Sequence, residues 1–227
     1  MTAWKALRDG FDAFTTRLPL LLGAWLVILV CQQVIDLLIP DSMILLETVI
    51  LLVVLAPIYA GQHLLALKVV RREPVAFKEL FAGMSKLAPL LGAYCLVTLL
   101  TILGLAAFII PGILVALMFS FVLIRFLDPK EGERAVRVTQ ALSESRRITT
   151  GYRGTLFGIG FLLGIPYMIL SLVLWMSAYN TGIPAWLVEV IAILSGTLFL
   201  GPVQATSFMV VYDHALKHPR LPGGQRS

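Results

Sequence analysis

Two acidic side chains lie inside stretches that are otherwise suited to a lipid environment. Glu47 and Glu189 each fall a short distance inside a long apolar segment. An ionisable group at such a depth is costly, and membrane proteins often retain one to bind an ion or a proton. Glu47 and Glu189 therefore raise the possibility of a cation or proton site near the outer mouth of a helical bundle. The interpretation that the sequence favours is that both carboxylates reach the outer interface and are solvated there.

Four arginines are of a type and spacing that could contact lipid headgroups. Arg137, Arg146, Arg147 and Arg153 belong to a segment, 137–153, in which an apolar stripe at helical spacing lies opposite the charged side chains. A helix of this kind next to a membrane span lies in the interface and attracts anionic lipid. An ordinary connector packed under the bundle would have the same pattern, and both interpretations stay open.

Neither a catalytic site nor a cofactor or metal site is predicted. The Ser, His and Asp residues show no triad context, and the glycine-rich nucleotide-binding patterns are absent from the sequence. Cys31 and Cys95 lie in separate apolar runs, which favours small buried side chains over metal ligands. We therefore expect a protein that is not an enzyme and needs no cofactor.

The composition places much of the chain in lipid. Of its 227 residues 59% are hydrophobic and 14% are charged, and the mean hydropathy is +0.91. A soluble domain is nearer half apolar and a quarter charged, so this chain could not bury its apolar surface in water. The net charge of +5 would suggest nucleic acid in a soluble protein. Here it is better explained by membrane orientation and anionic lipid, and no nucleic-acid partner is expected.

Charges and turn residues divide the chain into six predicted spans that form three hairpins of one membrane domain, 1–227. Pro111-Gly112 either forms the turn between the third and fourth spans or begins the fourth helix. A kink is expected at Gly201-Pro202 in the sixth span. The predicted spans are about 18–39, 43–67, 87–105, 110–127, 154–178 and 184–215.

The basic residues orient these spans. All 18 lysines and arginines fall before the first span, after the last, or in the connections after the second and fourth. The other three connections have none. Because basic residues accumulate on the cytoplasmic side, both termini are predicted to be cytoplasmic.

Each hairpin is preceded by a short amphipathic segment, which predicts interfacial helices on the cytoplasmic side. The first two units also resemble each other in sequence, since segments 6–27 and 76–96 align with one inserted residue. The repeating unit is therefore an interfacial helix followed by two spans. The apolar stripes of the first two segments are Trp4, Leu7, Phe11 and Phe14, and Phe77, Leu80, Phe81 and Met84.

One stretch, 110–161, resembles the YciC-like bacterial inner-membrane proteins and the membrane domain fused to some glycerophosphoryl diester phosphodiesterases. The resemblance rests on Pro111-Gly112-Ile113, Asp128, Ala141-Leu142, Ser145 and the basic residues that lead to Arg153. It implies this topology and a bacterial inner membrane. The phosphodiesterase catalytic domain has no counterpart in these residues, so that activity is not expected.

Together these features predict an all-α, polytopic membrane bundle that acts in membrane homeostasis, assembly or regulation. Its expected partners are membrane lipids, especially anionic ones, with a second copy or another membrane protein as a further possibility. The alternative function is a small transporter of a lipid or cation that uses the outer acidic residues. Transport would need a polar path through the bilayer, and the predicted spans offer few polar groups to line one.

Overall fold

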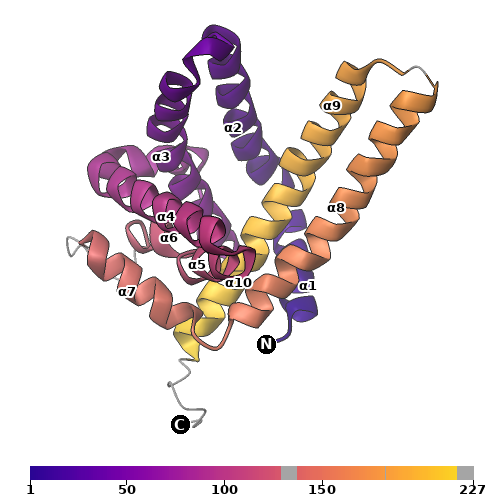
Figure 1. The fold of residues 1–227 in the computed structure, drawn as a ribbon. Coiled ribbons are helices and arrows are strands. Elements are labelled where there is room, and N and C mark those ends of the chain that lie inside the picture. Colours follow the sequence, from indigo (N-terminus) through magenta and orange to yellow (C-terminus); the bar gives the residue numbers. More distant parts are fainter. Residues whose placement is uncertain (129–136, 182, 219–227) are drawn as a thin grey trace.

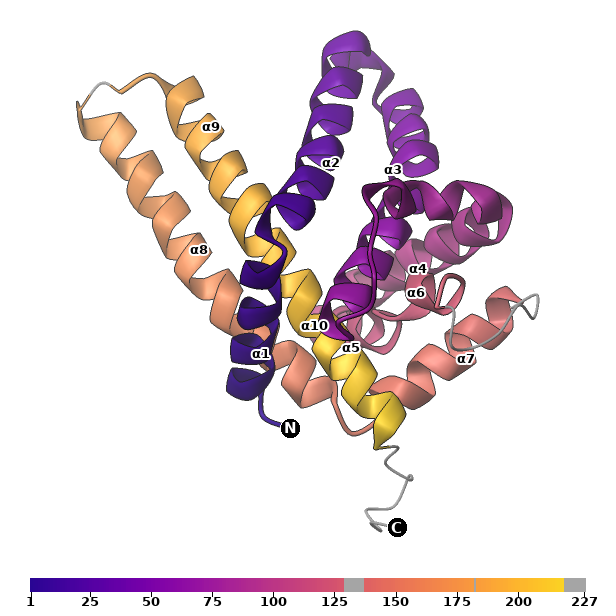
Figure 2. The same cartoon turned by 180° about the vertical axis from the view of Figure 1, so that it is seen from behind.

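The computed structural model describes residues 1–128, 137–181 and 183–218, and the regular structure within them is helical (Figures 1 and 2). This confirms the all-α prediction. Among the described residues, five helices are long and apolar enough to cross a membrane, and a sixth apolar segment, Ile109–Arg125, is shorter. The five are Leu18–Leu38, Leu46–Val70, Phe77–Ala107, Arg153–Asn180 and Trp186–Lys217. The side chains of Asp41, Leu45, Thr181, Ala185 and Glu189 lie outside the described part.

The first unit is a short helix followed by a hairpin with two long arms. It begins at Thr2, whose side-chain oxygen accepts a hydrogen bond from the backbone N–H of Lys5, as an N-cap does. Its last helix ends where Arg72 adopts a left-handed conformation (φ 57°) and Glu73 N–H donates to the carbonyl of Lys68 at 2.9 Å. The helices are α1 (Ala3–Thr16), α2 (Leu18–Leu38), η1 (Asp41–Met43) and α3 (Ile44–Val70).

The second unit has the same order with a shorter returning arm. Phe108 is extended and separates two helices, and Gly104 lies so close to Gly112 that an added Cβ would be 2.9 Å from the Gly112 Cα. Pro111 and Gly112 therefore belong to the first turn of the returning helix, which selects one of the two predicted alternatives. The predicted fourth span, 110–127, is divided by a turn at 119–121. The helices are η2 (a 3-10 helix, Phe77–Lys86), α4 (Leu87–Ala107), α5 (Ile109–Met118) and α6 (Val122–Arg125).

The third unit repeats the order again. Its returning arm contains a π-helical segment that ends directly before Gly201-Pro202, at the position of the predicted kink. Because proline lacks an N–H, an irregular turn at this position is expected. The helices are α7 (Val138–Thr149), α8 (Arg153–Thr181), α9 (Ala185–Leu194), η4 (Ser195–Leu200) and α10 (Gly201–Lys217).

The three units interlock in a ring. The short helix of each unit packs against the returning arm of another: α1 against α10, η2 against α3, and α7 against α6. Two of these junctions are so close that they require glycine. A Cβ on Gly10 of α1 would lie 2.6 Å from the Cα of Ser207 in α10, and a Cβ on Gly61 of α3 would overlap the backbone of Leu80 in η2. The short helices are therefore packed against the bundle over one face.

Burial supports the repeat that was identified in the sequence. Leu21 and Ala24 of α2 are fully buried, and so are Leu90 and Ala93 at the equivalent positions of α4. The two units thus present the same face to the interior.

The packed core lies near the end of the molecule where α1 begins and α10 ends, which we call the base (Figure 1). There α1, α3, α6, α7, α8 and α10 contribute buried side chains, including Leu67, Ile124 and Tyr212. Away from the base, the α2–α3 and α8–α9 hairpins diverge, and they expose large apolar side chains such as Leu37 (86% exposed). Such a surface is suited to lipid and not to water, so the protein is membrane-embedded.

Candidate functional site

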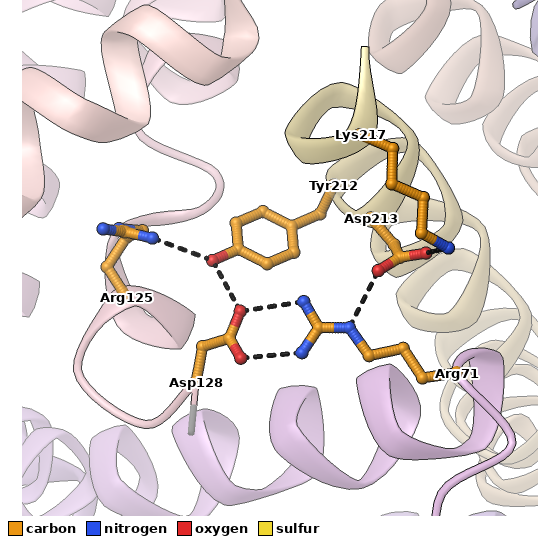
Figure 3. Close-up of polar contacts among 6 residues, drawn as sticks. All are labelled: Arg71, Arg125, Asp128, Tyr212, Asp213 and Lys217. Atoms are coloured by element: carbon orange, nitrogen blue, oxygen red, sulfur yellow. Dashed lines mark hydrogen bonds and ion pairs between the residues drawn. The ribbon is translucent and has the colours of Figure 1, made fainter. Parts of the chain in front are cut away.

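Charged side chains from all three units meet where the returning arms end. Arg71 follows the last residue of α3, Asp128 follows α6, and Asp213 lies in the last turns of α10. Arg71 Nη1 and Nη2 donate to Asp128 Oδ1 and Oδ2 at 2.7 and 3.0 Å, and Arg71 Nε donates to Asp213 Oδ1 at 2.8 Å (Figure 3). One guanidinium therefore links the three units.

Four further side chains extend this set. The Tyr212 hydroxyl donates to Asp128 Oδ2 at 3.1 Å and accepts a hydrogen bond from Arg125 Nη1 at 3.3 Å (Figure 3). Arg125 Nε in turn donates to Glu144 Oε2 of α7 at 2.8 Å. Lys217 pairs with Asp213 at 2.5 Å. We call the complete set the ion cluster: Arg71, Arg125, Asp128, Glu144, Tyr212, Asp213 and Lys217.

The centre of the ion cluster is buried. The side chain of Arg71 is 3% exposed and that of Asp128 is 0% exposed, whereas Lys217 at the edge is 64% exposed. Burial disfavours the charge on Arg71, but its hydrogen bonds to Asp128 and Asp213 outweigh this effect and raise its pKa above the ordinary arginine value. Arg71 therefore stays protonated at any working pH.

The charges within the ion cluster balance. Three cations, Arg71, Arg125 and Lys217, face three carboxylates, those of Asp128, Asp213 and Glu144. A buried carboxylate or guanidinium is tolerated only when it is paired and its hydrogen-bonding groups are satisfied. Both oxygens of Asp128 accept hydrogen bonds from side chains on other units. We call this arrangement the electrostatic clamp, because it holds the ends of the three returning arms together at the base.

Other lysines at the base are also bound to the protein. Lys68 Nζ pairs with Glu79 Oε1 at 2.7 Å and so links α3 to η2. Lys86 Nζ donates to the carbonyl of Phe126 at 2.6 Å, so the start of α4 lies beside the end of α6. Both ends of the second hairpin are therefore at the same level.

The four arginines that were predicted to contact lipid differ from these residues. Arg137, Arg146 and Arg147 are exposed, and within the described ranges none of their side chains makes a hydrogen bond or an ion pair. Arg153, at the start of α8, is partly buried, and its Nε is enclosed without a hydrogen-bond partner. On α7 the opposite face, which carries Ala141, Ser145 and Ile148, is buried. The face with unpaired arginines is thus directed away from the bundle.

The predicted outer acidic site is only partly described. Glu47 lies half-buried in the first turn of α3, but the side chain of Glu189 lies outside the described part. Solvation of both carboxylates at the outer interface therefore stays the prediction, and a site that they would form together stays the alternative. Two hydroxyls that could have lined a polar path are bonded within their own helices. Ser195 Oγ donates to the carbonyl of Ala192 at 3.0 Å, and Ser207 Oγ donates to that of Val203 at 2.7 Å.

The ion cluster was not predicted from the sequence. Asp128 entered only through the family resemblance, and Arg71 and Arg125 only as residues that orient the spans. A signal was nevertheless present, because Asp213 lies inside the predicted sixth span, 184–215, directly after Val210, Val211 and Tyr212. An acidic residue in such a helix requires a cationic partner. The identity of that partner, 142 residues away in the chain, depends on the fold.

In comparisons with family models, with curated proteins and with solved structures, no match to the chain was found.

Proposed function

We propose that this chain is a non-enzymatic integral membrane protein whose cytoplasmic face binds anionic lipid, and that it serves in membrane homeostasis, assembly or regulation. The observation that carries the proposal is the contrast between two sets of basic residues at the base. Arg71, Arg125 and Lys68 are neutralised by the protein's own carboxylates. Arg137 and the adjacent pair Arg146-Arg147 are exposed and have no such partner in the described part. Unpaired basic groups beside a membrane attract anionic headgroups.

Exposed apolar side chains on the short helices support the same placement. Trp4 of α1 is 68% exposed, and Phe77, Phe81 and Met84 of η2 are each about two-fifths exposed. On both helices, a lysine or arginine lies next to these side chains in the sequence. Aromatic and basic residues together anchor a helix at the headgroup level. In this proposal, α1, η2 and α7 lie at the cytoplasmic interface with one face on the bundle and one face toward lipid.

The proposed topology has six spans, with both termini cytoplasmic. α5 has 10 residues and would extend about 15 Å, half of the ~30 Å hydrocarbon core. The longer apolar segment Ile109–Arg125 approaches the minimum length for a span. Because Lys86 and Phe126 are in contact, this hairpin returns to the side from which it began. The side assigned to α7 is therefore the same whether the hairpin crosses fully or re-enters.

We also propose that the chain is a YciC-like protein of a bacterial inner membrane. The residues that carry the resemblance have structural roles here: Gly112 closes the α4–α5 hairpin, and Asp128 is the centre of the ion cluster. Ser145 of α7 donates to the carbonyl of Met118 at 2.9 Å and so joins α7 to the end of α5.

Replacing Arg137, Arg146 and Arg147 together with glutamine is expected to weaken phosphatidylglycerol binding. Each basic group near an anionic surface contributes about 1 kcal/mol, so the loss of three should lower affinity by roughly two orders of magnitude. Native mass spectrometry with defined lipid mixtures gives the measurement.

The charge-conserving triple lysine variant of these three arginines is the control for that experiment, and it should retain most of the binding because the attraction is largely electrostatic. Equal retention of phosphatidylglycerol by the glutamine variant and the unaltered protein would refute the proposed lipid contact.

A further inference from the structure

A groove near the base combines an apolar wall with a partly buried arginine. It has a volume of about 320 Å³ and lies between α5 and the start of α8. The α5 side is formed by Ile110, Ile113, Leu114 and Leu117, which share one helix face because their spacing is three, four and seven residues. The volume is at the lower end of the roughly 300–1,000 Å³ typical of small-molecule sites.

The α8 side of the groove supplies the polar group. Arg153 and Phe157, one turn apart, line it, and the Arg153 Nε is enclosed without a hydrogen-bond partner in the described structure. The Arg153 side chain as a whole is partly exposed, and its positive charge beside an apolar groove would attract an anionic oxygen. The groove is therefore apolar along its length, and Arg153 is the charged residue among those that line it.

The other face of α8 is already occupied. Thr155 Oγ1 donates to the carbonyl of Met1 at 3.1 Å, and a Cβ on Gly158 would lie 2.7 Å from the Cβ of Ala3. On the groove side, by contrast, a Cβ on Gly154 would have no atom within 4 Å. α1 thus covers one face of α8 and leaves the Arg153–Phe157 face open to the surroundings.

We infer that this groove is a binding site for one anionic phospholipid, with its phosphate on Arg153 and an acyl chain along α5. The inference rests on the proposed function and specifies where on the cytoplasmic face a lipid is held. The complementarity is both electrostatic and hydrophobic: the guanidinium binds the phosphate, and the face formed by Ile110, Ile113, Leu114 and Leu117 covers methylene groups.

Gly154→Leu tests the inference because it fills the groove from a position where the backbone leaves room. Leucine also has a higher helix propensity than glycine, so the helix itself should tolerate the change. The matched control is Gly160→Leu, on the same helix, where a Cβ likewise meets no atom within 4 Å and which does not line the groove. Titration with phosphatidylglycerol, followed by native mass spectrometry, should show about tenfold weaker binding of the first lipid for Gly154→Leu, as expected when a few methylene groups lose burial. Gly160→Leu should bind within twofold of the unaltered protein.

Three further experiments locate the phosphate and the acyl chain of the lipid. Arg153→Gln should weaken phosphatidylglycerol binding about fivefold and phosphatidylcholine binding less, because both lipids have the phosphate but only phosphatidylglycerol has a net negative charge. Phosphatidylglycerol with a photoreactive group in its acyl chain should label Leu114 or Phe157, and Gly154→Leu should abolish this labelling. Glycerol 3-phosphate, which has the anion but no chain, should not displace the lipid.

Each contrary result identifies what fails. Equal affinities for Gly154→Leu and Gly160→Leu would overturn the groove assignment, as would displacement by glycerol 3-phosphate at concentrations comparable to the lipid. If the groove variant binds normally while the triple variant of Arg137, Arg146 and Arg147 does not, the lipid-binding face remains and only this site is wrong. If neither variant loses affinity, the proposed function and this inference are both refuted.

Discussion

Asp128→Asn should lower the free energy of unfolding by about 3–5 kcal/mol, because it leaves the buried guanidinium of Arg71 paired with one carboxylate instead of two. Asp128 is fully buried, accepts two hydrogen bonds from Arg71 and accepts a third from Tyr212. Asparagine has nearly the same shape but no charge, and its amide nitrogen cannot accept the second of the two Arg71 hydrogen bonds. The measurement is reversible unfolding in detergent, followed by tryptophan fluorescence or circular dichroism.

Asp36→Asn is the matched control, since Asp36 is exposed and its described side-chain contact is one hydrogen bond from Gln33 at 3.5 Å. It should change stability by no more than about 0.5 kcal/mol. A double-mutant cycle with Arg71→Gln isolates the pair, and the double variant should lose less than the sum of the single losses by up to about 3 kcal/mol. Strictly additive losses, or an Asp128→Asn loss equal to that of Asp36→Asn, would contradict the clamp.

Gly61→Ala should destabilise the protein by about 3 kcal/mol or more, because the added methyl would overlap the backbone of η2. Its Cβ would meet the carbonyl group of Leu80, which is held within a helix and cannot rotate away. Gly83 of η2 meets the carbonyl group of Pro57 in α3 in the same way, so Gly83→Ala should have a comparable effect. Both losses can be measured as changes in the same unfolding transition.

Gly160→Ala is the control for this substitution, because its Cβ would meet no atom within 4 Å. Alanine is the better helix former by about 1 kcal/mol, so this variant should be as stable as the unaltered protein or more stable. The ring of three units depends on the α3–η2 contact. Equal stability of Gly61→Ala and Gly160→Ala would therefore contradict this arrangement.

Most of the helices could be predicted because their signals are local. Apolar length identifies the spans. The turn residues Pro40, Gly104, Gly112 and Pro184 lie near the ends of helices that the structure also shows. The repeat was visible because Gly-Ala and aromatic positions recur at a nearly constant spacing in the first two units. Equivalent burial of Ala24 and Ala93 agrees with that alignment.

The contacts between units could not be predicted in the same way. The packing of α1 on α10 brings Gly10 next to Ser207, and nothing in the sequence around either residue indicates this contact. The apolar stripe predicted for α1 also differs from the face that packs. The buried residues are Ala6, Gly10 and Phe14, while Trp4 is largely exposed. Helix–helix contacts in membranes are formed by small residues, so the largest apolar side chains are a poor guide to the packed face.

The ion cluster was missed for a related reason. Counting basic residues orients a membrane protein, but the count does not distinguish an arginine that meets lipid from one that meets an aspartate. Arg71 and Arg146 contribute equally to the count, although the first is buried in three charged hydrogen bonds and the second is exposed. Only the fold separates the residues that hold the protein together from those available for binding.

We propose that the base, with its unpaired arginines, faces the cytoplasm. Single-cysteine accessibility to a membrane-impermeant maleimide tests it most directly, in a background where Cys31 and Cys95 are replaced by serine. Both native thiols are free in the structure, and Cys95 is exposed. The reporter positions are exposed residues, so labelling reports the side of the membrane on which a residue lies and not whether the residue is buried.

In intact cells, Ser42→Cys and Asn180→Cys at the tips of the diverging hairpins should react, whereas Ser85→Cys and Ser143→Cys at the base should react only after permeabilisation. Phe108→Cys tests the second hairpin. Reaction from outside would show a full crossing, as the six-span topology requires, whereas labelling only after permeabilisation would show a re-entrant hairpin, which the groove shared by Ile110 and Arg153 favours. Labelling of Ser143→Cys in intact cells, with Ser42→Cys protected, would reverse the orientation and contradict the account.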